Sequence, residues 1–199
     1  MSAGPTHAHV SHAPSVPDAV VSDTVRWLER AVIGLNLCPF AKAVHVRGQI
    51  HYAVCMSEDE GDLLALMLDE ANALTNLPAQ ERDTTLLIAP RMLADFLDFN
   101  DFIARAERRL ARAGFEGVLQ LASFHPRFQF AGCEESDITN ATNQAPYPTL
   151  HLLREESIDK AVAAFPDAAS IYERNIDTLR ALGEAGWHAL DVGRHGANE

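Results

Sequence analysis

Three side chains with chemical potential lie at structural boundaries of the sequence. His125 lies between an apolar run, 118–124, and a proline, and its imidazole can transfer a proton near neutral pH or ligate a metal. Cys38 precedes Pro39, a residue favoured in the first turn of a helix, where the helix dipole lowers the pKa of a thiol and makes it nucleophilic. Arg154 follows another apolar run and can bind a carboxylate or phosphate through two parallel hydrogen bonds.

A polar loop, 125–148, connects these two apolar runs and is rich in amides, hydroxyls and aromatic rings. A loop of this length inside a compact domain usually has a function. Ligands of α/β proteins collect beyond the carboxyl ends of strands, so we expect the ends at His125 and Arg154 to meet in one pocket. The predicted catalytic residues are His125, Cys38 and Glu155, and the predicted substrate-binding residues are Arg127, Asn140, Asn143, Tyr147, Arg154 and Arg174.

Each of these residues also has a purely structural interpretation. His125 could fix the loop through a backbone hydrogen bond, and Cys38 could be a buried, protonated thiol, as free cysteines often are. Arg154 could pair with a loop carboxylate such as Asp137, and Glu155 could charge the first turn of the next helix. The asparagines and the tyrosine of the loop could cap turns.

Three functions follow from these alternatives. The first is a small-molecule enzyme of hydrolase or transferase type, with His125 as acid or base, Cys38 as an optional nucleophile, and Arg154 and the loop binding a polar or anionic substrate. The second is a mononuclear metal site in which carboxylates or a thiolate join His125. The third is a non-catalytic binding or assembly module, in which the loop aromatics form an interface.

Composition narrows the class of protein. The chain has 199 residues, of which 47% are hydrophobic and 22% charged, as is typical of one globular domain. Its formal net charge of −12 repels phosphate backbones, so we expect a small-molecule substrate and no nucleic-acid partner. We expect no membrane span, because no apolar stretch reaches about 18 residues. Three cysteines without a CxxC pair favour the cytoplasm, and the absence of nucleotide-binding and metalloprotease motifs leaves the cofactor unassigned.

Hydrophobic periodicity predicts an α/β fold. Helices are expected at 18–36, 58–77, 92–113, 157–165 and 170–185, and strands at 49–56, 84–89, 118–124 and 149–153. The helices between the first three strands imply that these strands are parallel neighbours. We therefore expect one sheet of about four strands, largely parallel, flanked by helices and preceded by an N-terminal helix, with the direction of the fourth strand open.

Domain boundaries follow from where the periodicity starts and stops. Residues 1–17 show no hydrophobic period and are expected to form a disordered tail, in which three histidines would bind metals only adventitiously. Residues 18–192 are expected to form the single domain, and 193–199 a C-terminal tail.

Five long motifs carry a family resemblance. They read GLNLCPFAK (34–42), LDFNDF (97–102), ASFHPRFQFAG (122–132), NATNQAPYPTLHLLREESI (140–158) and YERNI (172–176). With these motifs the chain resembles an uncharacterised bacterial family, the domain of unknown function 1415, over residues 20–190. The resemblance implies that the positions in the motifs belong together, and it adds no reaction, cofactor or partner.

Overall fold

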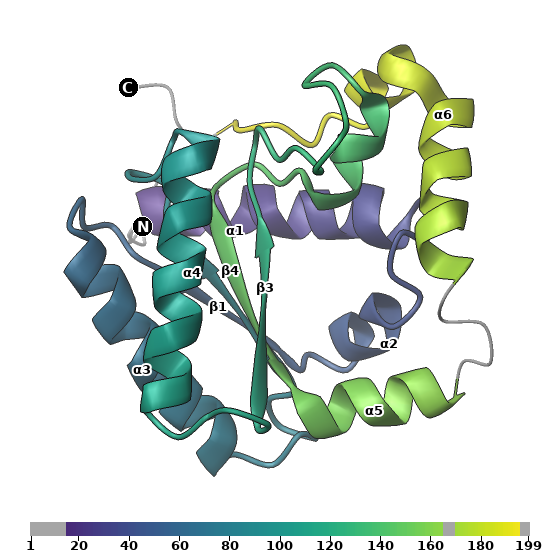
Figure 1. The fold of residues 1–199 in the computed structure, drawn as a ribbon. Coiled ribbons are helices and arrows are strands. Elements are labelled where there is room, and N and C mark those ends of the chain that lie inside the picture. Colours follow the sequence, from purple (N-terminus) through teal and green to yellow (C-terminus); the bar gives the residue numbers. More distant parts are fainter. Residues whose placement is uncertain (1–14, 165–169, 196–199) are drawn as a thin grey trace, which may run out of the picture.

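The computed structural model describes residues 15–164 and 170–195, which form a four-stranded sheet with helices on both faces (Figure 1). The strands are β1 (Ile50–Val54), β2 (Thr84–Ile88), β3 (Leu119–Phe124) and β4 (Thr149–Arg154). The helices are α1 (Val16–Trp27), its π-helical continuation η1 (Leu28–Ile33), α2 (Ala41–Val46), α3 (Glu60–Asn76), α4 (Phe96–Arg112), the 3-10 helix η2 (Ile138–Asn143), α5 (Glu155–Ala164) and α6 (Ile171–Ala189).

The α/β class and the four strands agree with the prediction, but the sheet is mixed rather than largely parallel. Its order is β1-β2-β4-β3, with β1 parallel to β2 and β4 antiparallel to both of its neighbours. The crossover helices α3 and α4 do give β1, β2 and β3 one direction. They do not make β2 and β3 neighbours, because β4 returns from the polar loop and inserts between them.

The ends of the helices differ from the predicted ones where side chains cap them. α1 begins at Val16, inside the predicted tail, because Ser15 and Asp18 form reciprocal capping hydrogen bonds. α3 begins after Asp59, whose carboxylate accepts hydrogen bonds from two backbone N–H groups of the first turn, rather than after Ser57. α2 was not predicted, because six residues are too few to show a helical period.

The two predicted tails are described only in part. Their residues outside the described ranges include His7, His9 and His12. Residues 193–195 are described and contact α1. The Arg26 guanidinium donates a hydrogen bond to the Gly193 carbonyl at 2.8 Å, and the backbone N–H of His195 donates to Asp23 at 2.9 Å.

α3 and α4 pack on one face of the sheet and form the main core. Their inward side chains, such as Met67 and Phe102, are fully buried, as the predicted helical stripes require. Alternate strand residues, including Leu87 and Leu152, complete this core.

The opposite face is covered unevenly by α1, η1, α2 and α5 (Figure 1). Near the end of β2, Val20 and Tyr147 pack tightly against Ile88. Toward the start of β2, the side chains of α1, α2 and α5 do not close on the sheet, and a cavity lies between them.

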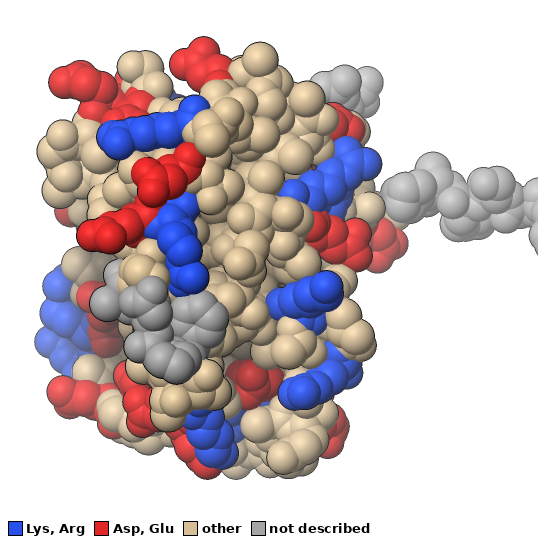
Figure 2. All heavy atoms as spheres, turned by 90° about the vertical axis from the view of Figure 1, so that its right-hand side faces the viewer, with Lys and Arg blue, Asp and Glu red and all other residues tan. Residues whose placement is uncertain are grey.

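Neither a membrane-spanning helix in the described part of the chain nor a patch of one charge sign on the face in Figure 2 stands out. Within the described ranges, no helix is both long and apolar enough to cross a membrane. Figure 2 shows the face that carries α5 and α6, where basic and acidic side chains are interspersed on either side of an uncharged band.

Candidate functional site

The predicted pocket between His125 and Arg154 is not formed. The residue before His125 pairs with Thr149, at the start of β4, whereas Arg154 ends β4 and pairs with Leu119. At about 3.3 Å per residue, these two ends lie roughly 17–20 Å apart along the sheet. The prediction that they meet was wrong because it assumed parallel strands, whose carboxyl ends share one edge, and β4 is antiparallel.

His125 is a structural histidine with both ring nitrogens bonded to the backbone. The side chain is fully buried, its Nδ1 accepts a hydrogen bond from the Arg127 N–H at 3.0 Å, and its Nε2 donates to the Leu93 carbonyl at 2.9 Å. Burial lowers the pKa of His125, so the ring stays neutral. It supports Leu93 in a left-handed conformation (φ 57°) just before α4. Neither nitrogen is left to act as an acid or base.

Arg154 caps the C-terminal end of α3. Its guanidinium donates hydrogen bonds to the carbonyl oxygens of Leu74, Leu77 and Arg82, the last two at 2.6 and 2.9 Å. A positive charge there complements the helix dipole and satisfies carbonyls that have no partner in the helix. Glu155 begins α5 at the same end of the sheet, far from His125. Glu155 has the structural arrangement weighed in the sequence, whereas Arg154 binds backbone carbonyls and not the loop carboxylate Asp137 that was suggested as its partner.

The two loop asparagines hold the loop together. Asn140 is fully buried, accepts a hydrogen bond from the Phe130 N–H at 3.0 Å, and donates one to the Glu134 carbonyl at 2.8 Å. The backbone carbonyl of Asn143 accepts a hydrogen bond from the His125 N–H at 3.1 Å. The side-chain amide of Asn143 donates to the Ser123 carbonyl at 3.4 Å, so both amides have partners within the protein.

The remaining predicted binding residues are spread over different surfaces. Tyr147 is fully buried, and its hydroxyl donates to Asp23 at 2.7 Å. The Arg127 guanidinium is exposed and pairs with Asp95, the N-cap of α4, at 3.2 Å. Arg174 lies exposed on α6. The structure does not gather these three side chains with His125 into one pocket.

Cys38 lies in the turn before α2 rather than at a helix N-terminus. The helix begins at Ala41 with Phe40 as its N-cap, so Pro39 is not in its first turn. Burial raises the pKa of the Cys38 thiol, although the backbone N–H groups of Phe40 and Ala41 act in the opposite direction. The thiol is therefore protonated at neutral pH, which favours the structural interpretation over a nucleophile.

The two other functional alternatives gain no support from the loop. Within residues 15–164 and 170–195, no three His, Cys, Asp or Glu side chains come together as ligands for a metal ion. Two of the loop aromatics are half-buried: Phe128 contacts Phe96 of α4 at 5.1 Å between ring centroids, and Phe130 contacts the exposed Tyr172 of α6 at 6.1 Å. They attach the loop to the two helices.

The best-formed candidate site is the cavity on the α1 face of the sheet, with a volume of about 390 Å³. That volume lies within the range of roughly 300–1,000 Å³ that small-molecule sites occupy. The lining comes from α1, η1, α2, α5 and all four strands, and it is predominantly apolar. Its larger apolar side chains are Trp27, Leu28, Phe40, Ile50, Leu86, Phe124, Leu153 and Ile158.

Among the polar side chains of this cavity, Gln120 is exposed, and His151 of β4 is a partly buried one whose bonding is incomplete. The Thr84 hydroxyl donates its one proton to the Leu152 carbonyl at 2.7 Å, so it accepts the hydrogen bond from His151 Nε2 at 2.6 Å. Nε2 therefore carries the ring proton. Nδ1 keeps a lone pair that receives no hydrogen bond from the described part of the chain, and His151 can offer this acceptor to a molecule in the cavity.

The electrostatics of the cavity select against charge. Burial lowers the pKa of His151 to about 4, so its ring is neutral at physiological pH. The described lining contains no Lys or Arg, and its one acid, Asp83, accepts a hydrogen bond from the Ser157 hydroxyl at 2.6 Å. An anion placed here would meet no opposite charge.

The sequence contains a signal for His151 that lies within a strand rather than at a strand end. In TLHLL, the alternation places Leu150 and Leu152 on the core face and Thr149, His151 and Leu153 on the other. A histidine inside an apolar strand, facing away from the main core, indicates a polar group that the second layer must accommodate.

Comparison with known proteins identifies the family. The sequence profile of a family described as "Protein of unknown function (DUF1415)" matches residues 19–189. The chain belongs to this family. No curated protein and no solved structure matches it. The cavity lining, from Trp27 to Ala161, falls entirely within the part of the chain that matches the DUF1415 profile.

Proposed function

We propose that this DUF1415 protein binds a small, mostly apolar molecule in the cavity on the α1 face, with one hydroxyl or N–H group of the ligand donating to Nδ1 of His151. The observation that carries the proposal is the fixed tautomer of His151, which leaves its Nδ1 as an acceptor in a predominantly apolar cavity of about 390 Å³. A predominantly apolar pocket with a small number of placed polar groups is the usual design of a small-molecule site.

The charge of the cavity defines the class of ligand. A carboxylate or phosphate would be buried without a cation, which costs several kcal/mol by order of magnitude. A phenol, an indole or an aliphatic alcohol loses far less on transfer and gains the hydrogen bond to His151. The proposed ligand is therefore neutral, in contrast to the polar or anionic substrate that the sequence suggested.

The proposal is one of binding rather than of hydrolysis or group transfer. His125 has no nitrogen available for proton transfer, and the Cys38 thiol in the cavity wall is protonated. We retain the cytoplasm as the proposed location, which is consistent with three free thiols, Cys38, Cys55 and Cys133. Nucleic acid is left out of the proposal because of the net charge of −12.

Three matched probes test the proposal by calorimetry on the full chain. We expect saturable binding of 1-naphthol, about tenfold weaker binding of naphthalene, which lacks the donor, and weaker binding still of 1-naphthoate. In His151→Phe, 1-naphthol should bind only as well as naphthalene. The control His188→Phe, at an exposed histidine outside this cavity, should leave the affinity unchanged.

A second variant tests the location independently of the histidine. Ala122→Leu on β3 places extra carbon atoms in the cavity and should abolish binding of both neutral probes while the protein stays folded. Tighter binding of 1-naphthoate than of 1-naphthol, or unchanged 1-naphthol affinity in Ala122→Leu, would overturn the proposal.

A further inference from the structure

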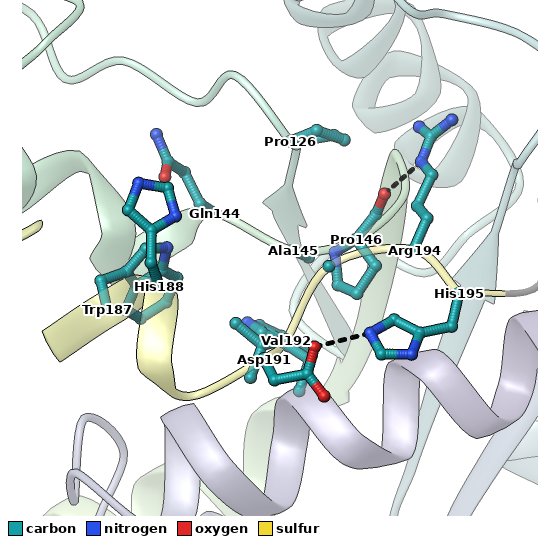
Figure 3. Close-up of a pocket in the computed structure, with 12 residues that line it drawn as sticks. Pro126, Gln144, Ala145, Pro146, Trp187, His188, Asp191, Val192, Arg194 and His195 are labelled. Atoms are coloured by element: carbon teal, nitrogen blue, oxygen red, sulfur yellow. Dashed lines mark hydrogen bonds and ion pairs between the residues drawn. The ribbon is translucent and has the colours of Figure 1, made fainter. Parts of the chain in front are cut away.

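A second hollow, which Trp27 also lines, has a volume of about 500 Å³ (Figure 3). Its walls are Gln144–Pro146 of the polar loop, Trp27 of α1, and the C-terminal segment from Trp187 to His195. We call it the C-terminal cleft. Asp191–His195 lie beyond the residues that match the family profile. Its chemistry differs from that of the apolar cavity, and the proposed function makes no use of it.

Arg194 is held in this cleft by two contacts that leave part of its guanidinium unused. Its Nε donates to the Pro146 carbonyl at 2.6 Å, and its Cζ lies 4.7 Å from the centre of the buried Tyr147 ring. Its two Nη groups donate to no acceptor among the described residues. A guanidinium fixed in this way can present two parallel N–H groups to a planar anion.

No carboxylate of the described part of the chain forms an ion pair with this guanidinium. Among the described lining residues, Asp191 is the one acid. Its carboxylate already binds His195 at 2.7 Å and Arg30 at 3.2 Å. On the far wall, His188 and Gln144 lie side by side and are two further polar side chains of the cleft (Figure 3). The cleft is therefore a locally basic site on a protein with a net charge of −12.

The walls also offer apolar surface next to the positive charge. Trp187 is half-buried and packs in the same cluster as Trp27 and Val192. Pro126 and Pro146 line the cleft as well. Proline rings near an arginine, with Trp187 at the other end of the cleft (Figure 3), suit a ligand that has an anionic group and a hydrophobic body.

We propose that the C-terminal cleft binds a small organic anion, with its carboxylate or phosphate on the Nη groups of Arg194 and its apolar part against Pro126 and Pro146, which lie between Arg194 and Trp187 (Figure 3). The inference is independent of the neutral-ligand cavity. The two sites share the Trp27 side chain as a wall but would take ligands of opposite character.

Intrinsic fluorescence reports this cleft directly, because both tryptophans of the chain line it. In Trp27→Phe, Trp187 is the one remaining tryptophan, and it does not line the apolar cavity. The probes are phenylacetate, phenyl phosphate, inorganic phosphate and the neutral phenylacetamide. We expect saturable changes in Trp187 emission with the two organic anions, and at least tenfold weaker binding of phosphate and of phenylacetamide. The ratio of the affinities for phenylacetate and phenyl phosphate shows whether the cleft prefers a carboxylate or a phosphate.

Substitutions at Arg194 test the contact. Arg194→Met keeps the aliphatic part of the side chain and should weaken phenylacetate binding at least tenfold. Arg194→Lys keeps the charge but not the two parallel N–H groups, so its affinity for phenylacetate should lie between that of Arg194→Met and that of the native protein. Arg108→Met, on the exposed face of α4, removes the same charge far from the cleft and should bind normally. Urea unfolding of each variant verifies its fold.

Three results would overturn the inference. Equal binding of phenylacetamide and phenylacetate would show that no anion is recognised. An equal loss in Arg108→Met and Arg194→Met would show a general charge effect. If Trp27→Phe does not fold, calorimetry of phenylacetate with the native chain replaces the fluorescence measurement, and no heat of binding at millimolar concentrations would exclude the site.

Discussion

His125 and His151 belong to neighbouring strands of the same sheet, yet their surroundings have opposite character. At the end of β3, the polar loop supplies one partner to each nitrogen of His125 and closes tightly around the ring. In the middle of β4, Thr84 engages one nitrogen of His151, and the other borders a cavity. A histidine in a polar loop finds backbone partners easily, whereas one in an apolar layer keeps its unused nitrogen. The polar loop around His125 therefore has a structural role, and the apolar cavity beside His151 is the candidate site.

The largest contrast is expected in stability. His125→Ala removes two hydrogen bonds to the backbone and the ring that packs on Phe96 and Phe99, and should lower the free energy of unfolding by about 3 kcal/mol. Urea unfolding measures the loss, with the exposed His188→Ala as the control at less than about 0.5 kcal/mol. Because His125 does not line the cavity, folded His125→Ala should still bind 1-naphthol. Loss of 1-naphthol binding without loss of stability would instead place His125 in the binding site.

Acid pH should destabilise the folded protein through both histidines. Burial holds the pKa of His151 at about 4, below its ordinary 6.5, so between these pH values the unfolded chain takes up a proton that the folded chain does not. The free energy of unfolding should therefore fall as pH decreases from 6.5 to 4, by up to about 3 kcal/mol from His151. His125, whose pKa is also lowered, adds to the decrease.

Urea unfolding at pH 7, 5.5 and 4.5 measures this decrease in the native chain and in His151→Phe. The variant should lose the His151 part of the pH dependence and keep the part that His125 contributes. An identical pH profile for the two proteins would mean that His151 accepts a proton as readily in the folded state as in the unfolded state.

The role of Thr84 should appear as a moderate effect on binding. Thr84→Val keeps the shape of the side chain but removes the acceptor of the His151 Nε2 proton, so the ring is free to exchange tautomers. We expect 1-naphthol to bind about two- to fivefold more weakly and naphthalene to bind as before. Nitrogen-15 spectra of the imidazole should show one tautomer in the native protein and a mixture in the variant.

The smallest effect concerns the thiol in the cavity wall. Cys38 should react with iodoacetamide at pH 7.5 more slowly than a small free thiol, because burial raises its pKa. Saturating 1-naphthol should slow the reaction further, by about twofold or more, since Cys38 lines the same cavity. Mass spectrometry of the labelled peptides measures both rates. Protection of Cys133, which does not line the cavity, to the same extent would point to a different binding site.

Local patterns predicted most of the elements, and long-range pairing explains most of the errors. Apolar spacing located the long helices and all four strands to within a few residues, because that spacing is a local property of the chain. The insertion of β4 between β2 and β3 leaves no local trace. The same antiparallel insertion separates Arg154 from His125. The wrong strand order therefore also led to the wrong prediction that these two residues share a pocket.

The candidate residues divide along the same line. That His125 could fix the loop through the backbone was visible from its place beside a strand end, and the structure shows this arrangement. That Arg154 would cap α3 was not visible, since the helix lies some 80 positions earlier in the chain. The orientation of His151 was encoded in strand alternation, but the cavity beside it depends on how α1, α2 and α5 pack, which no local pattern specifies.

The position of β4 also has a consequence for how the protein folds. The centre of the sheet pairs Thr84 with Leu153, residues that are far apart in the sequence, and β2 and β3 can be joined only through β4. Contacts between distant positions require a large loop to close first and slow the folding of a domain. On the ribosome, the inner edge of β2 stays unpaired until the last strand of the sheet has been synthesised. We therefore expect the parallel β1–β2 unit with α3 to form early and sheet closure through β4 to be the late, rate-limiting step.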